Sequence, residues 1–472
     1  MISMSLVDAK SMIDALTSDG DVCFSGVSID SRTVSKGEMF VAIKGPNFDG
    51  HDYILDAKQR GAAAAMVSRE LEIELPMIQV ADTKHGLAML AKGWRQSYQA
   101  PLIALTGSNG KTSVKEMIGA ILAVEHRVLL TRGNYNNDLG VPLTLLRLSE
   151  EDEYAVVELG ANHLGEISHL SRLATPDIAL ITNIGNAHLE GFGSQDNIAK
   201  GKAEIFEGLS ENGVAILNRD DAYYEQLSDS AKQFRQISFG AHKNADIRLK
   251  NNTLRASVKG CQWQTEFDVL TSDDDIHVKL NLAGRHNVQN ALAAIAVSVA
   301  LNISTASMIA GLASMQVVAG RMQLKPGLGQ WTVIDDTYNA NPKSLEAALD
   351  VLSTVEGKKI LVVGDMAELG ESSSQLHENI GRLARASGVT ELYAVGEQSE
   401  RAIESFGLNG KHYESQLNLV NDLIASLHRD NYENECTILV KGSRSAQMDR
   451  IVDALVIDGA NNGAPFLASA VS

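Results

Sequence analysis

The sequence predicts an α/β protein with three domains, of which the middle one is built on a mainly parallel sheet. The chain has 472 residues, which fits about three domains of ordinary size. From about residue 99 to 314, apolar segments of strand length alternate with segments of helix length. A second alternating block follows from about residue 315. We therefore expect domains at 1–98, 99–314 and 315–472.

The composition is that of an ordinary globular protein, with 44% hydrophobic and 21% charged residues. The 41 basic and 59 acidic residues give a net charge of −18, which argues against a protein that binds nucleic acids or acidic membranes through its overall charge. Any anionic ligand must therefore be held by a local arrangement of groups.

Cysteine usage and the absence of targeting segments predict a cytoplasmic protein. Cys23, Cys261 and Cys436 show no CxxC spacing, so we expect free thiols in a reducing compartment rather than disulfides or a zinc site. Residues 1–10 lack a basic region followed by an apolar core, so no signal peptide is expected. No uncharged apolar run reaches about 18 residues, so we expect no membrane insertion.

Residues 1–98 predict a small α/β domain, with a strand at 38–43, a helix near 53–60 and an apolar segment at 62–67. Ser31, Arg32, Lys44 and His51 could hold an anionic group. From the residues alone, we favour the interpretation that they are polar residues of turns and of the surface.

The middle domain is organised around a predicted phosphate-binding loop. An apolar strand at 102–105 leads into a glycine-rich turn and a helix that opens at Thr112 or Ser113. Gly107 and Gly110 allow successive N–H groups to point toward one place, next to the positive end of the helix. Lys111 would reach the terminal phosphates of a nucleotide, and the Thr112 hydroxyl would contact Mg²⁺.

This loop departs from the usual P-loop pattern. G-x-x-x-x-G-K-[ST] requires a glycine at position 105, which is Leu105 in this chain, and the loop has the compact form TGSNGKT. The alternative is an ordinary strand-to-helix turn. ATP binding is favoured because the glycines, the lysine and the threonine follow an apolar strand in the expected order.

Three more residues of the middle domain are candidates for chemistry. Glu158 ends the predicted strand at 154–159, where its carboxylate could hold Mg²⁺, or could simply face water. His188 follows the strand at 178–183, and a single histidine is more often structural. Lys202 would be an ordinary lysine on a helix surface. A lysine near metals can, however, be converted to a carbamate, which behaves as a carboxylate.

The end of the middle domain breaks the alternation. After a strand at 214–217, a polar β-like stretch runs from about 245 to 282. The segment 284–290 then opens an apolar helix at 291–301.

The last block predicts a Rossmann-like, doubly wound sheet. Its expected strands are 331–335, 359–364, 391–395 and 437–440. Ligands in such sheets gather at the carboxyl ends of the strands, where several polar segments of this block lie. They are Asp335-Asp336, Gly364-Asp365 and residues 441–444.

Two features near residue 330 could serve a ligand. The segment 335–342 is dense in polar groups, although a turn stopped by Pro342 would be enough to explain it. Arg321 carries a guanidinium suited to a phosphate or a ribose.

Taken together, these motifs resemble the Mur ligases, the ATP-dependent enzymes that build the peptide of bacterial peptidoglycan. The resemblance covers nearly the whole chain. The general family elements are 106–112, Glu158, 186–188, Lys202, 284–290 and 320–321. Four further segments resemble the members that add D-alanyl-D-alanine to UDP-N-acetylmuramoyl-tripeptide: 134–142, 336–342, 364–370 and 441–448.

Some positions differ from related patterns. The Asp-Asn-Pro-Arg signature for a diamino acid substrate is absent, and residues 340–343 stand in its place. Folylpolyglutamate synthases share the core but not the segments 134–142 and 336–342. Gly201 and Asp449 are small departures from the family pattern.

The resemblance implies a site for ATP and two Mg²⁺ ions, with Lys111, His188 and Lys202 as catalytic residues. Thr112 and Glu158 would hold the first ion, and His188 and carbamylated Lys202 would hold or position the second. Arg321 and Asp336 would contact ribose or phosphate. The implied phosphate-loop and adenine residues are Thr106, Gly107, Ser108, Asn109, Gly110, Lys111, Thr112, His286, Asn287 and Asn290.

The resemblance also implies where the other substrates bind. Asn136 and Asn137 would meet the tripeptide, and Asn339 and Asn341 would lie on the side of the incoming dipeptide. The N-terminal domain would hold the UDP-sugar through Ser31, Arg32, Lys44, Asn47, Asp49 and His51.

The implied reaction is an amide-bond ligation through an acyl phosphate, in cytoplasmic synthesis of cell-wall precursors. We expect a monomer that binds small molecules and no nucleic acid. We also expect its C-terminal domain to close when the substrates bind. Lysine and diaminopimelate are both compatible with the sequence as the third peptide residue. The alternatives are another Mur ligase, a folylpolyglutamate-type ligase, or a P-loop protein whose nucleotide cycle drives a conformational change.

Overall fold

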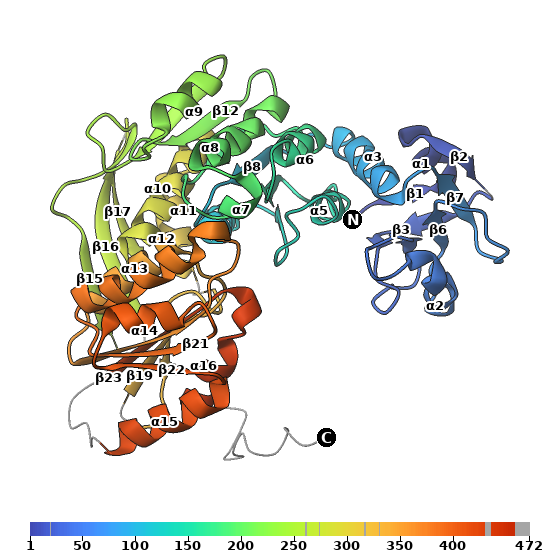
Figure 1. Cartoon of the computed structure of the whole chain (residues 1–472). Coiled ribbons are helices and arrows are strands. Elements are labelled where there is room, and N and C mark those ends of the chain that lie inside the picture. The colour runs from blue at the N-terminus through green and yellow to red at the C-terminus, as the bar shows by residue number, and fades with distance from the viewer. Residues whose placement is uncertain are drawn as a thin grey trace.

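The computed structural model describes residues 1–18, 20–259, 262–272, 274–315, 318–329, 331–429 and 436–457. Cys261 lies outside these ranges, while Cys23 is an exposed free thiol and Cys436 a buried one. Within the described ranges, none of the helices combines the length and the apolar character that a membrane span needs. The α/β fold class is confirmed, with three large sheets that follow one another along the chain (Figure 1).

The N-terminal part holds a five-stranded sheet in the order β2-β7-β6-β5-β4. Strands β4 to β7 pair in parallel, and β2 closes one edge in antiparallel fashion. A small antiparallel pair joins β1 to β3. The strands are β1 (Ser3–Ser5), β2 (Ala15–Ser18), β3 (Cys23–Ser25), β4 (Val27–Ser28), β5 (Met39–Val41), β6 (Ala64–Val67) and β7 (Met77–Val80). The helices are α1 (Leu6–Met12), η1 (Gly50–Tyr53), α2 (Ile54–Gln59) and α3 (Thr83–Gln96).

The middle part holds a ten-stranded sheet in the order β15-β16-β14-β13-β12-β11-β8-β10-β9, with β17 beside β16. The strands from β9 across to β14 pair in parallel, and the polar β-like stretch forms an antiparallel extension. The strands are β8 (Leu102–Thr106), β9 (Val128–Leu130), β10 (Tyr154–Glu158), β11 (Ile178–Ile181), β12 (Val214–Asn218), β13 (Arg235–Gly240), β14 (Ile247–Leu249), β15 (Arg255–Lys259), β16 (Gln262–Leu270) and β17 (Asp275–Leu280).

Helices cover both faces of this sheet. Along β8, Leu102 and Ala104 belong to one apolar cluster, while Ile103 and Leu105 belong to the cluster on the other face. This alternation follows from the two-residue period of a strand. The helices are α4 (Lys111–Leu122), α5 (Gly140–Leu145), α6 (Glu166–Ala174), α7 (Leu189–Phe192), α8 (Gln195–Ala203), η2 (Glu204–Gly208), α9 (Tyr224–Ser230), α10 (Arg285–Ala300) and α11 (Thr305–Ser314).

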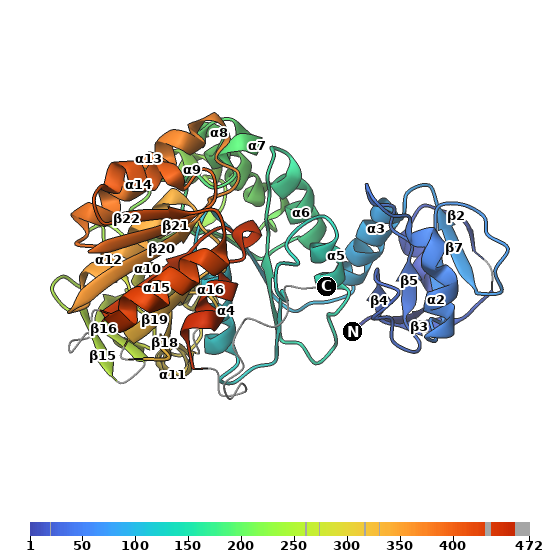
Figure 2. The ribbon, with the colours of Figure 1, turned by 60° about the horizontal axis from the view of Figure 1, so that its bottom comes forward.

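The C-terminal part holds a six-stranded sheet in the order β18-β19-β23-β20-β21-β22, parallel except for β18. Leu361 and Val363 face the layer of α12 to α14, whereas Ile360 and Val362 face α15 and α16 (Figure 2). The strands are β18 (Gln323–Pro326), β19 (Trp331–Asp336), β20 (Lys358–Gly364), β21 (Glu391–Val395), β22 (Gly410–Tyr413) and β23 (Cys436–Lys441). The helices are α12 (Pro342–Ser353), η3 (Gly370–Ser372), α13 (Ser373–Ala386), α14 (Glu400–Phe406), α15 (Gln416–Arg429), η4 (Arg444–Ala446) and α16 (Asp449–Leu455).

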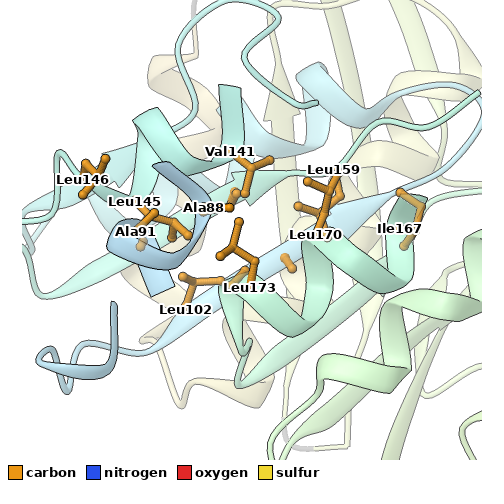
Figure 3. Close-up of a cluster of buried hydrophobic side chains, with 14 of the residues drawn as sticks. Ala88, Ala91, Leu102, Val141, Leu145, Leu146, Leu159, Ile167, Leu170 and Leu173 are labelled. Atoms are coloured by element: carbon orange, nitrogen blue, oxygen red, sulfur yellow. The ribbon is translucent and has the colours of Figure 1, made fainter. Parts of the chain in front are cut away.

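Helix α3 joins the N-terminal part to the middle part. Ala88 and Ala91 on α3 pack against apolar side chains of α5 and α6, among them Leu145 and Leu173 (Figure 3). Trp94 also donates from its indole Nε1 to the Leu148 carbonyl at 3.2 Å. The junction is therefore a packed apolar core with directed hydrogen bonds, rather than a loose linker.

Arg95, buried at the end of α3, is expected to be the polar centre of this junction. Its guanidinium donates to the carbonyls of Ala174 at 3.1 Å and Thr175 at 3.3 Å, at the C-terminus of α6, and to Asp177 at 3.3 Å. Because Arg95→Ala leaves the buried Ala174 carbonyl without this donor, while the half-exposed Asp177 keeps the Leu102 N–H, we expect a loss of about 2 kcal/mol in the free energy of unfolding. Urea unfolding measures it. Exposed Arg172→Ala is the control, and an equally small loss in both variants would contradict the prediction.

Candidate active site

The glycine-rich loop lies between β8 and α4, as predicted, although α4 begins at Lys111 rather than at Thr112 or Ser113. Gly107 has a φ of 147° and Gly110 a φ of 82°, both in the region that favours glycine. A Cβ on Gly107 would lie 1.9 Å from Thr182 Oγ1, and one on Gly110 would lie 2.4 Å from Asn290 Oδ1. The loop therefore needs glycine at both positions, for conformation and for space.

Asn183 holds this loop in place. Its Oδ1 accepts the Asn109 N–H at 3.1 Å, and its Nδ2 donates to the Asn109 carbonyl at 3.0 Å. The backbone N–H of Ser108 donates to the Asn183 carbonyl at 2.9 Å. Sequence reasoning missed this role. The signal was its position just past β11, which pairs with β8.

Lys111, Thr112 and Glu158 meet at the carboxyl end of β10. Lys111 Nζ donates to the Gly107 carbonyl at 2.7 Å, and Thr112 Oγ1 donates to Glu158 Oε2 at 3.1 Å. Asn136 Nδ2 donates to the other oxygen of the buried Glu158 carboxylate at 2.8 Å. Desolvation lowers the pKa of Lys111, and the Glu158 charge opposes this shift. The cluster therefore places the Lys111 ammonium group beside two hard oxygen ligands, the Thr112 hydroxyl and the Glu158 carboxylate.

Lys202 is buried on α8, with 1% of its surface exposed, and its Nζ has no hydrogen-bond partner among the described residues. The ammonium nitrogen lies 5.4 Å from the centre of the Phe192 ring. Burial, followed by the positive charge of Lys111, lowers the pKa of Lys202 to about 7. Gly201 leaves room for Phe192, because a Cβ there would lie 2.5 Å from the ring. A buried, partly neutral amine of this kind is a competent nucleophile for CO₂.

The buried Lys202 amine should make the free energy of unfolding depend on pH. The pKa of Lys202 falls from 10.5 to about 7 on folding, so between these values the unfolded chain binds more protons. The free energy of unfolding should then rise with pH, by up to about 1.4 kcal/mol per pH unit. Lys202→Met should lack this slope, so its stability advantage is fully present at and below pH 7 and shrinks as the pH rises toward 10.5. Urea unfolding in CO₂-free buffer measures the difference, and parallel pH profiles would contradict it.

His188 directly precedes α7 and has a φ of 60°, and its Nδ1 lies 2.5 Å from Glu368 Oε2 of the C-terminal part. The close approach of His188 is the main reason why the pKa of Glu368 is lowered, although His188 Nδ1 lies outside hydrogen-bond geometry. Sequence reasoning singled out the segment 364–370 but assigned no role to Glu368.

The predicted adenine residues lie in the first two turns of α10. Asn287 Nδ2 donates to the Ala283 carbonyl at 2.7 Å, and Asn290 Nδ2 donates to Asn287 Oδ1 at 3.1 Å. Burial lowers the pKa of His286, which favours a neutral ring. Helix α10 begins at Arg285, so these residues lie in the helix rather than before it.

Three contacts connect the C-terminal part to the loop region. Arg321 Nη2 donates to Thr112 Oγ1 at 3.2 Å, and Asn341 Nδ2 donates to Asn109 Oδ1 at 2.7 Å. Lys343 Nζ reaches the Ile184 carbonyl at 3.3 Å. Arg321, one of the predicted ribose or phosphate residues, and Asn341, one of the predicted dipeptide residues, thus lie against the phosphate loop.

A second ion pair, between Lys441 and Asp336, lies on the C-terminal side of the cleft. Lys441 Nζ lies 2.5 Å from Asp336 Oδ2 and donates to the Asn339 carbonyl at 3.1 Å. Lys441 is buried, so its charge is available only to groups within the cleft. Sequence reasoning noted the segment that contains Lys441, but not this pairing with Asp336.

A cavity of about 1560 Å³ separates the middle part from the C-terminal part. Most of the predicted residues of these two parts line it. They are Ser108, Asn109, Gly110, Lys111, Thr112, Asn136, Glu158, His188, His286, Asn287, Asn290, Arg321, Asp336, Asn339 and Asn341. Thr106, Gly107, Asn137 and Lys202 are not in its lining; the Thr106 hydroxyl donates to the Leu159 carbonyl, and Asn137 Oδ1 accepts the N–H of Gly140, the first residue of α5.

The predicted residues of the N-terminal part do not line this cavity. His51 is buried, with Nδ1 at 2.5 Å from Asp49 and Nε2 accepting the Ser68 N–H at 2.9 Å. Exposed Arg32 pairs with Asp30 at 2.8 Å. In Figures 1 and 2 this part lies beyond α5 and α6, whereas the C-terminal part lies against the middle part.

The fold and the site define a P-loop protein with a large cavity between its middle and C-terminal parts. Sequence models of one family match three successive parts of the chain: the Mur ligase family catalytic domain at 24–95, the middle domain at 105–298 and the glutamate ligase domain at 320–444. The chain is also 42% identical to the UDP-N-acetylmuramoyl-tripeptide--D-alanyl-D-alanine ligase of Escherichia coli strain K12, over 97% of this chain and 100% of the relative. The chain belongs to the Mur ligase family.

Solved structures agree with this assignment. MurF from Acinetobacter baumannii superposes with a TM-score of 0.89 at 36% identity, covering 96% of this chain and 98% of that one. MurF ligase from Thermotoga maritima, in complex with ADP, superposes with a TM-score of 0.79 at 28% identity, covering 91% of this chain and 96% of that one.

Proposed function

We propose that this protein is an ADP-forming ligase that joins D-alanyl-D-alanine to UDP-N-acetylmuramoyl-tripeptide, in the cytoplasmic synthesis of peptidoglycan precursors. The observation that carries the proposal is the phosphate loop, with Lys111 and Glu158, at the floor of a cleft whose other wall is the C-terminal part. The names of the relatives supply the substrates, and the ADP complex of the Thermotoga maritima enzyme supports ATP as the energy source.

Each of the three parts of the chain would bind a different set of ligands. We assign residues 1–98 to the UDP-sugar, 99–314 to ATP and 315–472 to ATP and the incoming dipeptide. The apolar junction at α3 supports this assignment, because it would hold the long nucleotide-sugar at a fixed angle to the middle part. The rigid attachment of one domain and the polar, separable cleft of the other fit closure by the C-terminal part.

The residues present fit Mg²⁺. The Glu158 carboxylate and the Thr112 hydroxyl are buried hard oxygen ligands that lie 3.1 Å apart, next to the phosphate loop. In the described residues there is no cluster of three His, Cys, Asp or Glu side chains. This suits an ion that keeps several waters and binds mainly to substrate phosphates. His188 and a carbamate on Lys202 would hold a second ion, and the unpartnered Lys202 amine supports that modification. When bound, these ions neutralise charge on the transferring phosphate.

The residues would then act in sequence. The loop N–H groups and Lys111 bind the phosphates of ATP and offset their repulsion of the substrate carboxylate. The tripeptide carboxylate attacks the γ-phosphorus, which gives an acyl phosphate and ADP. The amine of D-alanyl-D-alanine attacks the acyl carbon, and phosphate leaves with the former carboxyl oxygen. Phosphorylation is needed because a carboxylate is a poor electrophile, whereas phosphate is a good leaving group.

Substrate dependence tests this function. Release of ADP should require both UDP-N-acetylmuramoyl-tripeptide and D-alanyl-D-alanine, with single amino acids failing to replace the dipeptide. Tripeptides that end in lysine and in diaminopimelate should be compared in the same assay. ATP hydrolysis that is indifferent to both substrates would instead support a nucleotide-driven switch protein.

A further inference from the structure

Trp263 lies on β16 of the middle part, but its side chain belongs to an apolar cluster of the C-terminal part. Only 4% of its surface is exposed, and the cluster includes Met322 and the α12 residues Leu349 and Leu352. Ala283 joins the same cluster from the middle part. The antiparallel extension of the middle sheet is therefore anchored in the core of the C-terminal part.

The polar edge of the Trp263 side chain bonds the segment that opens the C-terminal part. Its indole Nε1 donates to the Met322 carbonyl at 2.9 Å. The N–H of Met322 donates to Asp336 Oδ1 at 3.2 Å. Both hydrogen bonds are buried, and a buried carbonyl without a donor is costly. The indole therefore fixes where Met322 lies.

The turn formed by residues 320–322 has a backbone that needs such support. Gly320 has a φ of 70° and Met322 a φ of 54°, although Met322 is not a glycine. A left-handed residue with a Cβ is strained and persists only where its surroundings hold it. The N–H of Tyr338 donates to the Gly320 carbonyl at 3.0 Å. The turn is thus held at one end by Trp263 and at the other by Tyr338.

Arg321 extends from the middle of this turn toward the phosphate loop. Its guanidinium carbon lies 4.2 Å from the centre of the Tyr338 ring, and its Nη2 donates to Thr112 Oγ1 at 3.2 Å. Arg321 Nε is buried and has no hydrogen-bond partner among the described residues. An unpaired donor of this kind suits a ribose or phosphate oxygen as its acceptor.

We propose that Trp263 is a positioning residue that holds the 320–322 turn, so that Arg321 meets the nucleotide beside the phosphate loop. It rests on the proposed function, in which Arg321 belongs to the ATP site. Trp263 is not in the lining of the cavity, so it acts on the nucleotide only through the turn. A residue of the middle part thereby sets the position of a charged group of the C-terminal part.

A double-mutant cycle tests this coupling. Trp263→Phe keeps an aromatic ring and removes the donor, and it should raise the Kd for ADP with Mg²⁺ about tenfold. Arg321→Ala should raise this Kd at least as much. The double variant should bind ADP no more weakly than Arg321→Ala, because no guanidinium is left to position. Isothermal titration calorimetry of the full chain measures the four affinities.

Two results of this cycle would overturn the proposal. One is wild-type affinity for ADP in Trp263→Phe or in Arg321→Ala. The other is a double variant in which the two losses add, because Trp263 would then support the structure without acting through Arg321.

Trp331→Phe is the matched control. Trp331 is also buried, and its indole Nε1 donates to the Leu455 carbonyl at 3.1 Å, within a different apolar cluster of the C-terminal part. The two Trp→Phe variants should lower the unfolding temperature by similar amounts, but Trp331→Phe should keep the wild-type Kd for ADP. An equal loss of ADP affinity in both variants would reduce the effect of Trp263 to general destabilisation and overturn the proposal.

Gly320→Ala disturbs the same turn without touching Trp263. Its Cβ would lie 3.0 Å from the Tyr338 nitrogen, at a φ that disfavours alanine, so ADP binding should also weaken. Exposed Gly388→Ala, at a φ of 78°, is its control and should bind ADP as the wild type does. Unchanged affinity in Gly320→Ala would overturn the proposal. Failure of the proposed function would look different, because ADP release would then not depend on the D-dipeptide, whereas these affinities are measured without it.

Discussion

Lys111→Ala is expected to lower the kcat for substrate-dependent ADP release by at least about a thousandfold. Lys111 is the one ammonium group on the phosphate loop, and its Nζ now rests on the Gly107 carbonyl at 2.7 Å. Desolvation lowers its pKa, which marks a site where a charge is weakly screened and acts strongly on an arriving anion. Steady-state measurement of ADP release with both substrates tests the prediction.

The control for Lys111 is Lys232→Ala, which removes an exposed lysine that pairs with Asp229. It should leave kcat unchanged. Lys111→Ala should also unfold at the temperature of the wild type, because the substitution removes a single hydrogen bond to a carbonyl. A Lys111→Ala enzyme that keeps more than a tenth of the wild-type kcat would remove the loop lysine from the mechanism.

Lys202→Ala is expected to lose at least about a hundredfold in kcat, with partial recovery when acetate or formate is added. The reason is that Lys202 Nζ is buried without a hydrogen-bond partner among the described residues, a position that suits a carbamate better than an ammonium ion. Its pKa of about 7 leaves the amine increasingly neutral above that pH, so carbamate formation should increase as the pH rises through 7. Kinetics in buffers with and without bicarbonate test this.

Lys200→Ala is the matched control for Lys202, since both lysines lie on α8 and Lys200 is exposed. It should retain full activity and show no response to added carboxylates. Full activity of Lys202→Ala without any additive would refute the carbamate role. Loss of activity without rescue by any short carboxylate would leave Lys202 a structural residue.

The fold and the phosphate loop could be predicted from the sequence because both depend on patterns of residues that are close together in the chain. Apolar strands in a parallel sheet are nearly continuous, so β8 and β20 are visible as runs of buried residues. Short strands such as β9 and β22 were missed, because three or four residues carry too little pattern to be separated from a loop. The antiparallel edge strand β18 was missed for the same reason.

The contacts across the cleft were beyond sequence reasoning. Asn341 donates to Asn109, and Lys441 pairs with Asp336. These residues lie far apart in the sequence, and the periodicity of helices and strands predicts only contacts between residues that are close in sequence. The resemblance indicated which side chains belong to the site, but not their partners. The N-terminal residues show the limit most clearly, because Asp49 and His51 bond to each other and do not line the central cavity.

The most direct test of the central claim follows the oxygen atoms of the substrate carboxyl group. UDP-N-acetylmuramoyl-tripeptide labelled with ¹⁸O in its terminal carboxyl is incubated with ATP and D-alanyl-D-alanine, and the released phosphate is analysed by mass spectrometry. An acyl-phosphate route predicts one ¹⁸O atom in each phosphate. Phosphate that carries no label would contradict the route.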